Sequence, residues 1–262
     1  MNKIIVITSG KGGVGKTTTA INLGAAINYF GGDVVVIDAN LTTPNVGIHL
    51  NSPEVPISLS HVLLKKAEVF EAVYEHESGM KVIPSSISVK EIGKINPASI
   101  KNYKKDFKKI AEYIIMDSSA GLGDETLSVL DLADEIIIVS NPEMPAITDA
   151  LKTIKIAEKM NKPIRGVIMT RVRKNKTEMQ PEMVREMLEV PILGMIPEDI
   201  VVQEALALKN AVVHTHPKSN PSRAYKEIAA RIMNVQYDSE KDREKLLHKI
   251  LKKFKITKWG KR

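Results

Sequence analysis

The chain has 262 residues, of which 43% are hydrophobic and none is cysteine. This length and composition suit one large α/β domain, with two small domains as the alternative. The lack of cysteine excludes a disulfide scaffold and any iron–sulfur cluster held by thiolates. The formal net charge of +7 comes from residues 239–262, because acidic and basic residues balance in the rest of the chain. We therefore divide the chain into a domain over residues 1–237 and a basic tail over residues 238–262.

Every apolar run is shorter than the ~20 residues of a membrane-spanning helix. The chain enters a predicted strand directly after its first residues, without the pattern of a signal peptide. We therefore expect a cytoplasmic protein.

A glycine-rich loop follows the first predicted strand, residues 3–8, and precedes a helical pattern. It contains Gly10, Lys11, Gly12, Gly13, Val14, Gly15, Lys16, Thr17 and Thr18. Two glycines five residues apart, followed by Lys-Thr, are typical of a phosphate-binding loop. Glycine lets successive backbone N–H groups converge on phosphate oxygens, and the helix N-terminus adds its positive dipole end. We expect Lys16 to contact the outer phosphates and the Thr17 hydroxyl to ligate Mg²⁺.

The same loop carries a second lysine, Lys11, which phosphate binding alone does not require. With it, the loop resembles the deviant Walker signature K-G-G-x-G-K-[ST]-[ST] of the MinD/ParA family of P-loop ATPases, and MinD in particular. The resemblance implies that Lys11 reaches the nucleotide of a partner subunit in an ATP-dependent homodimer, as a cation supplied in trans. The alternative is a solvent-exposed loop lysine.

Apolar strand patterns alternate with helical patterns along the domain. This alternation predicts an α/β fold with a doubly wound, mostly parallel sheet flanked by helices, and ligands at the carboxyl ends of the strands. Further strands are predicted over residues 33–38, 81–83, 113–116, 135–139, 166–169 and 192–196, and helices over residues 145–160, 180–188 and 200–209.

The second strand ends in Asp38, Ala39 and Asn40. A carboxylate at this strand end can hold Mg²⁺ through water or orient the attacking water, while the alternative is a helix cap or turn former. The family carries D-x-D here. The resemblance therefore implies that Asp38 acts on Mg²⁺ or on the attacking water, and it puts Asn40 at the position of the second Asp. An amide can orient water but cannot take its proton, which puts the hydrolysis rate in question more than nucleotide binding.

The strand over residues 113–116 runs into Asp117, Ser118, Ser119, Ala120 and Gly121. An Asp after such a strand is the second element of a phosphate site, and we expect its carboxylate to meet Mg²⁺ through water. A simple turn at the strand end is the alternative. The family reads D-S-P-A-G here, which implies that the Gly121 amide contacts the γ-phosphate.

Two later stretches match family positions beside the adenine base. Thr170 and Arg171 stand where relatives carry Asn-Arg, and Pro197, Glu198 and Asp199 match the base-side loop. Threonine has one hydroxyl where asparagine offers a donor and an acceptor, so one base-reading amide is absent. ATP as the nucleotide follows from the resemblance, since the loop itself does not distinguish adenine from guanine.

The tail has a helical apolar pattern. At about 100° per residue, five residues share one narrow arc and the lysines project elsewhere; these are Leu246, Leu247, Ile250, Leu251 and Phe254. Trp259, near the end, suits a membrane–water boundary. The pattern predicts an interfacial helix on an anionic membrane, and the resemblance implies the same, since MinD relatives end in such a helix. A helix packed on the sheet and a helix that binds nucleic acid remain alternatives.

The sequence thus predicts a MinD-type ATPase that slowly hydrolyses ATP to ADP and phosphate. It is expected to bind ATP and Mg²⁺, to dimerise, and to cycle on the cytoplasmic membrane so as to position a structure such as the division site. An activating protein partner is left open. The alternatives are a nucleotide-binding scaffold with negligible hydrolysis, motivated by Asn40, and a ParA-type DNA-partitioning ATPase, which the neutral body of the domain makes the less favoured.

Overall fold

A computed structural model describes residues 2–52, 54–88, 91, 93–173, 175 and 177–238. The predicted membrane residues Leu246, Leu247, Ile250, Leu251, Phe254 and Trp259 lie outside the described residues. The division into a domain and a tail therefore stays a prediction.

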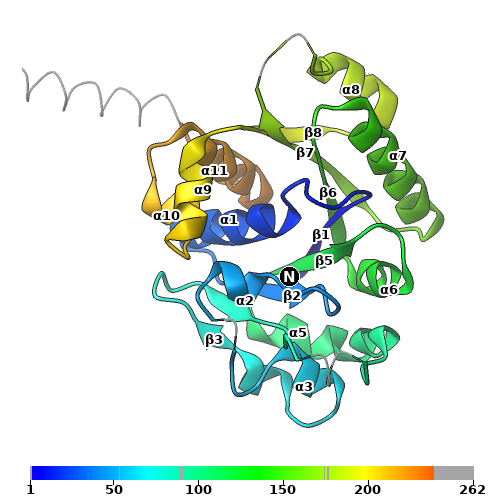
Figure 1. Ribbon diagram of the computed structural model, residues 1–262, viewed down its shortest axis with the longest axis vertical. Coiled ribbons are helices and arrows are strands. Elements are labelled where there is room, and N and C mark those ends of the chain that lie inside the picture. The colour runs from blue at the N-terminus through cyan, green and yellow to red at the C-terminus, as the bar shows by residue number, and fades with distance from the viewer. Residues whose placement is uncertain are drawn as a thin grey trace, which may run out of the picture.

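Within the described residues, the fold is built on an eight-stranded sheet in the order β3-β4-β2-β5-β1-β6-β7-β8 (Figure 1). All neighbouring strands are parallel except β3 and β4, which are antiparallel. The strands are β1 (Lys3–Ser9), β2 (Val34–Ala39), β3 (Tyr74–Glu75), β4 (Lys81–Ile83), β5 (Tyr113–Ala120), β6 (Glu135–Ser140), β7 (Ile164–Val172) and β8 (Ile192–Pro197). The seven predicted strands are confirmed, and the two-residue β3 was not predicted.

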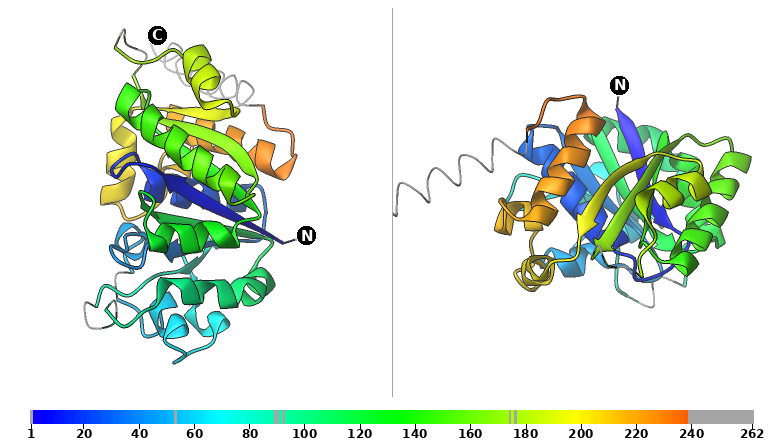
Figure 2. Two further views of the ribbon diagram at one scale, coloured as in Figure 1. Left: turned by 90° about the vertical axis from the view of Figure 1, so that its right-hand side faces the viewer. Right: turned by 90° about the horizontal axis from the view of Figure 1, so that it is seen from above.

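Helices cover both faces of the sheet (Figure 2). One face carries α1 (Lys16–Tyr29), α2 (Val46–His49), α9 (Ile200–Ala207), α10 (Val212–Thr215) and α11 (Asn220–Met233). The other face carries α3 (Leu59–Leu63), η1 (Val69–Ala72), η2 (Pro97–Tyr103), α5 (Lys104–Ile110), α6 (Asp124–Leu132), α7 (Met144–Lys159) and α8 (Pro181–Leu188). The predicted doubly wound α/β fold and its three named helices are confirmed.

Strand β1 shows why the sheet needs both helical layers. Its side chains alternate between two cores: Ile4 and Val6 belong to the core under α5, α6 and α7, whereas Ile5 and Ile7 belong to the core under α1 and α11. All four are fully buried. A strand that is apolar on both faces is stable only at the centre of a covered parallel sheet. Its carboxyl end therefore opens between the layers, where the glycine-rich loop begins.

Candidate nucleotide-binding site

The loop between β1 and α1 has backbone conformations that require glycine. Gly13 has φ +78° and Gly15, the N-cap of α1, has φ +90°, both in the left-handed region. Gly10 is required for a different reason, because a Cβ there would lie 2.3 Å from the Asp149 carbonyl oxygen of α7. Within the described residues, the backbone N–H groups of residues 11–15 donate to no protein acceptor. They form an arrangement suited to an anion.

The two loop lysines lie in different environments. Lys16, the first residue of α1, is only 9% exposed. Burial lowers the pKa of its ammonium, and the nearby Asp117 carboxylate partly opposes this. Lys11 is exposed, and in the described part of the chain its ammonium forms neither an ion pair nor a hydrogen bond. Lys16 thus lies buried beneath the loop, while the Lys11 ammonium is accessible to a negative charge outside this subunit.

Thr17 and Asp117 meet beside the loop. The Thr17 hydroxyl donates to Oδ2 of Asp117 over 2.6 Å, whereas Oδ1 of Asp117 is buried and has no hydrogen-bond partner among the described residues. Burial raises the pKa of Asp117 to about 6, although the Thr17 hydrogen bond and the Lys16 charge oppose it. A buried carboxylate oxygen without a donor is costly unless a cation or a metal-bound water meets it.

These two side chains fit Mg²⁺, which prefers oxygen ligands and keeps several waters. Among the described residues, no group of three or more His, Asp or Glu side chains could hold a metal by itself. Thr17 and Asp117 would therefore share the ion with phosphate oxygens and water.

Asp38 faces Asp117 in the register of β2 and β5 and is fully buried. Its Oδ2 accepts the N–H groups of Asn45 and Val46, both over 2.9 Å, and its Oδ1 accepts that of Asn40 over 3.2 Å. Burial and the Asp117 charge raise the pKa of Asp38 well above its usual range, against these three bonds. The bonds to Asn45 and Val46 cap the start of α2. A capping role is the alternative that the sequence offered for Asp38. Its role near metal or water stays a prediction.

The Asn40 side chain is engaged within its own turn. Its Nδ2 donates to the Thr43 carbonyl over 2.6 Å, and its Oδ1 accepts the Thr43 N–H over 3.2 Å and the Thr43 hydroxyl over 3.1 Å. Its Oδ1 thus already accepts two hydrogen bonds, while the second N–H of Nδ2 is left to donate to a water molecule.

Glu125 also contacts this segment, and sequence reasoning missed it. It lies in the first turn of α6 and accepts hydrogen bonds from Leu41 and Thr42. Leu41 precedes Glu125 by 84 residues, so no local pattern links the two. The only signal in the sequence is an acidic residue shortly after Gly121. The Gly121 N–H itself donates to the Ser9 carbonyl over 3.0 Å.

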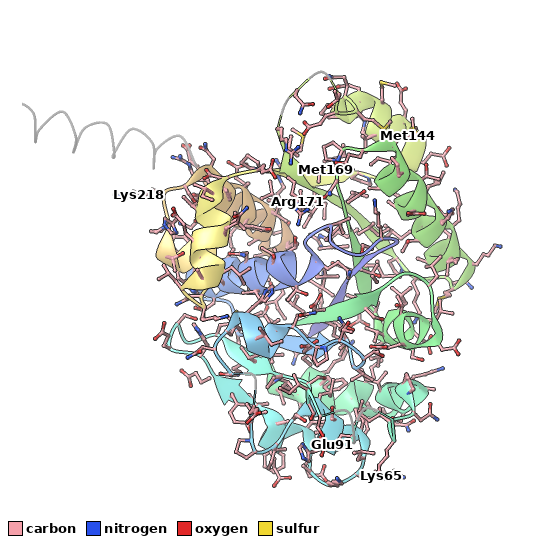
Figure 3. All side chains as sticks on the ribbon, viewed as in Figure 1. Lys65, Glu91, Met144, Met169, Arg171 and Lys218 are labelled. Atoms are coloured by element: carbon pink, nitrogen blue, oxygen red, sulfur yellow. The ribbon has the colours of Figure 1, made fainter. Side chains whose placement is uncertain are left out.

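A pocket of about 310 Å³ brings together the predicted base-side residues. It is lined by Val14, Gly15, Thr18, Thr170, Arg171, Ile196, Pro197, Glu198, Asp199, Val202, Gln203, Leu206 and Tyr225. Arg171, labelled in Figure 3, is exposed at the carboxyl end of β7. The phosphate loop thus adjoins both stretches that the sequence assigned to the base.

The polar side chains of this pocket are partly engaged. The Thr170 hydroxyl lies 2.6 Å from the Val14 carbonyl oxygen and 2.9 Å from Oδ1 of Asn141, so its proton is held within the protein. Asp199 caps α9 by accepting the Val201 N–H, and Glu198 pairs with Arg173. The remaining polar side chains of the pocket are those of Thr18, Arg171, Gln203 and Tyr225, whose hydroxyl meets that of Thr19.

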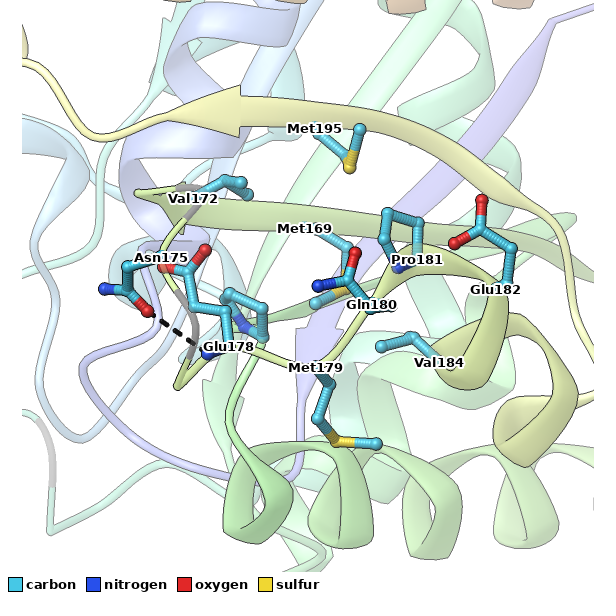
Figure 4. A pocket seen from close by; sticks show the side chains of 11 residues that line it. Met169, Val172, Asn175, Glu178, Met179, Gln180, Pro181, Glu182, Val184 and Met195 are labelled. Atoms are coloured by element: carbon cyan, nitrogen blue, oxygen red, sulfur yellow. Dashed lines mark hydrogen bonds between the residues drawn. The ribbon is translucent and has the colours of Figure 1, made fainter.

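A second pocket, of about 370 Å³, lies beside α8 and the edge strand β8 (Figure 4). It contains none of the predicted site residues. Its walls are mostly apolar, and its lining is Pro142, Met169, Val172, Asn175, Glu178, Met179, Gln180, Pro181, Glu182, Val184 and Met195. Among the described residues, its lining shares no member with the pocket beside the phosphate loop.

Comparison with known proteins decides the family. A family model described as ParA, NUBPL iron-transfer P-loop NTPase, matches residues 1–233. The chain belongs to the MinD/ParA family of P-loop ATPases. The iron transfer in that description cannot involve a cluster held by thiolates here, because the chain has no cysteine.

Within the MinD/ParA family, an uncharacterized ATP-binding protein of Methanocaldococcus jannaschii is 36% identical over 250 residues, covering 95% of each chain. The septum site-determining protein MinD of Pyrococcus horikoshii, solved in complex with Mg-ADP, superposes with a TM-score of 0.85 at 31% identity, covering 88% of this chain and 96% of that chain. A chain of the MinC:MinD cell division protein complex of Aquifex aeolicus gives a TM-score of 0.81 at 28% identity, covering 90% of this chain and 97% of that chain. The resemblance read from the loop is confirmed.

Within the described part of the chain, no helix combines the length and the apolar character needed to cross a membrane.

Proposed function

We propose that this protein is an ATP-dependent switch of the MinD type. It binds ATP with Mg²⁺, pairs with a second copy of itself, and returns to the single form by hydrolysing ATP to ADP and phosphate. One observation carries the proposal: the open N–H groups of the loop lie next to a buried Lys16 and to an exposed Lys11, which has no acidic partner among the residues that the structure describes.

Each residue has a distinct role in this proposal. The loop amides and Lys16 bind the outer phosphates, and the base occupies the pocket beside Arg171. Thr17 and Asp117 hold the magnesium ion, which neutralises phosphate charge when bound. Lys11 stabilises the charge that develops on the phosphates of the partner copy, where a well-placed cation is worth a large part of the rate.

The attacking water would lie near the segment that begins at Asp38. Asp38 holds the backbone of this segment through three hydrogen bonds, and Asn40 fixes its turn. An amide at position 40 can orient water but cannot accept its proton, so slow turnover is expected.

The tail gives the switch an output. A segment that carries the whole net charge of +7 and an apolar helical arc suits an anionic membrane. Two tails joined in a dimer bind far more tightly than one, so ATP controls attachment. The name of the Pyrococcus relative, a septum site-determining protein, supports a role in positioning a cellular structure. The Aquifex MinC:MinD complex supports a protein partner.

Sedimentation with vesicles of anionic lipid, combined with a phosphate-release assay, tests the proposal. The full chain should sediment with Mg·ATP and not with Mg·ADP, and a chain that ends at residue 238 should stay in solution. Lys16→Ala should abolish phosphate release and sedimentation together. Equal sedimentation with both nucleotides, or retention on duplex DNA that survives removal of the tail, would contradict it.

A scaffold without hydrolysis is the second candidate, and the engagement of Asn40 with Thr43 favours it. Turnover of the wild type and of Asn40→Asp, each measured with vesicles present, separates the two. If the wild type and the variant release no phosphate, the scaffold is the correct description.

A further inference from the structure

The carboxylate of Glu125 joins two segments that flank the phosphate loop. Its Oε1 accepts the N–H of Leu41 over 2.5 Å and that of Thr42 over 3.3 Å, and its Oε2 accepts the Thr42 hydroxyl over 2.6 Å. One side chain of α6 thus holds two consecutive residues of the loop after β2. Hydrogen bonds to a charged acceptor are stronger than neutral ones, so this contact is more than incidental packing.

The first of these segments, residues 38–46, is fixed elsewhere by its own residues. Asp38 holds the N–H groups of Asn45 and Val46, and Asn40 holds Thr43. Leu41 and Thr42 lie between these fixed points and receive their contact from Glu125. A change in the position of Glu125 would therefore act on the middle of the segment.

The second segment, residues 117–125, contains Asp117 at one end and Glu125 at the other. Between them, Gly121 has φ +83° and donates its N–H to the Ser9 carbonyl, which immediately precedes the phosphate loop. A phosphate oxygen that took this N–H would replace the bond to Ser9 and shift the backbone around Gly121. Glu125 lies only four residues further on, at the start of a rigid helix.

We propose that Glu125 is a positioning residue that couples these two segments, so that a change at Gly121 moves Leu41 and Thr42. The proposal rests on the proposed ATP switch. It identifies Glu125 as the contact through which residues 117–125 act on residues 38–46 across the phosphate site. Position 40 carries an amide, and Glu125 provides a carboxylate that contacts the same segment. Glu125 acts through the backbone of residues 41 and 42 and is not assigned a contact with the nucleotide.

Hydrogen–deuterium exchange of residues 40–46 tests this coupling directly. In the wild type, exchange in this segment should differ at least about threefold between a non-hydrolysable ATP analogue and ADP, each with Mg²⁺. Glu125→Ala should abolish the difference while changing the affinity for the analogue less than about threefold. Glu125→Gln should retain it, because the amide oxygen still accepts the two N–H groups and the amide nitrogen can donate to the Thr42 hydroxyl.

The matched control is Asp124→Asn, which removes a negative charge from the same helical turn without touching residues 41 and 42. It should keep the wild-type difference in exchange. Thr42→Val, which removes one of the three donors, should reduce the difference and add little to the effect of Glu125→Ala.

Three results would overturn the coupling: no difference between the nucleotides in the wild type, a difference that persists in Glu125→Ala, or an affinity that falls more than tenfold in that variant. The exchange measurement needs binding and no turnover. Phosphate release by the wild type tests the proposed ATPase separately, so a failure of one can be told from a failure of the other.

Discussion

Replacing Asp117 with asparagine should stabilise the metal-free protein at neutral pH while removing its ability to hold magnesium. Asp117 is fully buried, and its Oδ1 has no hydrogen-bond partner among the described residues. An asparagine keeps an oxygen that can accept the Thr17 hydroxyl and carries no charge to bury. The carboxylate to which we assign the magnesium ion is thus expected to lower the stability of the fold.

The pKa of Asp117 sets the size of this effect. Burial raises it from 3.8 to about 6 in the folded chain, and at about 1.36 kcal/mol for each pKa unit the ionised form costs about 3 kcal/mol. Below pH 4 both folded and unfolded chains keep the proton, and the cost is absent. Between pH 4 and 6 the unfolded chain ionises first, so stability falls as the pH rises, and above pH 6 the full cost is present.

Calorimetry in a chelating buffer measures the prediction. At about 2–4 °C for each kcal/mol in a domain of this size, Asp117→Asn should raise Tm by about 6–12 °C at pH 7.5 and by little at pH 4. Asp124→Asn, at an exposed position, serves as the control and should show no such pH dependence. A Tm of Asp117→Asn at pH 7.5 that equals or falls below that of the wild type would refute the reasoning.

Two further substitutions test other parts of the site. Gly10→Ala should destabilise the fold by about 1–3 kcal/mol and weaken nucleotide binding more than tenfold, because its Cβ would meet the Asp149 carbonyl. Denaturant unfolding would measure the loss of stability, and a binding titration would measure the loss of affinity. Gly12→Ala, whose Cβ would meet nothing within 4 Å, is the matched control for stability. Asn40→Asp should raise kcat at least about tenfold by adding a group that accepts the proton of water. An unchanged or lower kcat, measured by phosphate release, would show that the turn with Thr43 matters more than proton transfer.

Local sequence was a good guide wherever one segment carries the whole pattern. The glycine-rich loop, the seven longer strands and the meeting of Thr17 with Asp117 follow from short motifs and from the order of strands in a parallel sheet. The base-side stretches are 26 residues or more apart, yet they meet in one pocket because they lie at the carboxyl ends of two neighbouring strands, β7 and β8.

The sequence was a poorer guide wherever a polar side chain has a choice of partners. For Asp38 it left a cap and a catalytic role open, and the three backbone bonds depend on how residues 40–46 turn back. The role of Glu125 depends on a contact between α6 and the loop after β2, which no periodicity reports. Strand β3 has only two residues, and it forms by antiparallel pairing with β4.

The central claim is that ATP joins two copies of this protein through Lys11. Light scattering during size-exclusion chromatography of the wild type and of Lys11→Ala, each with Mg·ATP or Mg·ADP, tests it most directly. We expect the mass of the wild type to double with ATP only, and Lys11→Ala to bind ATP and remain single. A wild type that stays single with ATP, or a Lys11→Ala variant that pairs as well as the wild type, would contradict the claim.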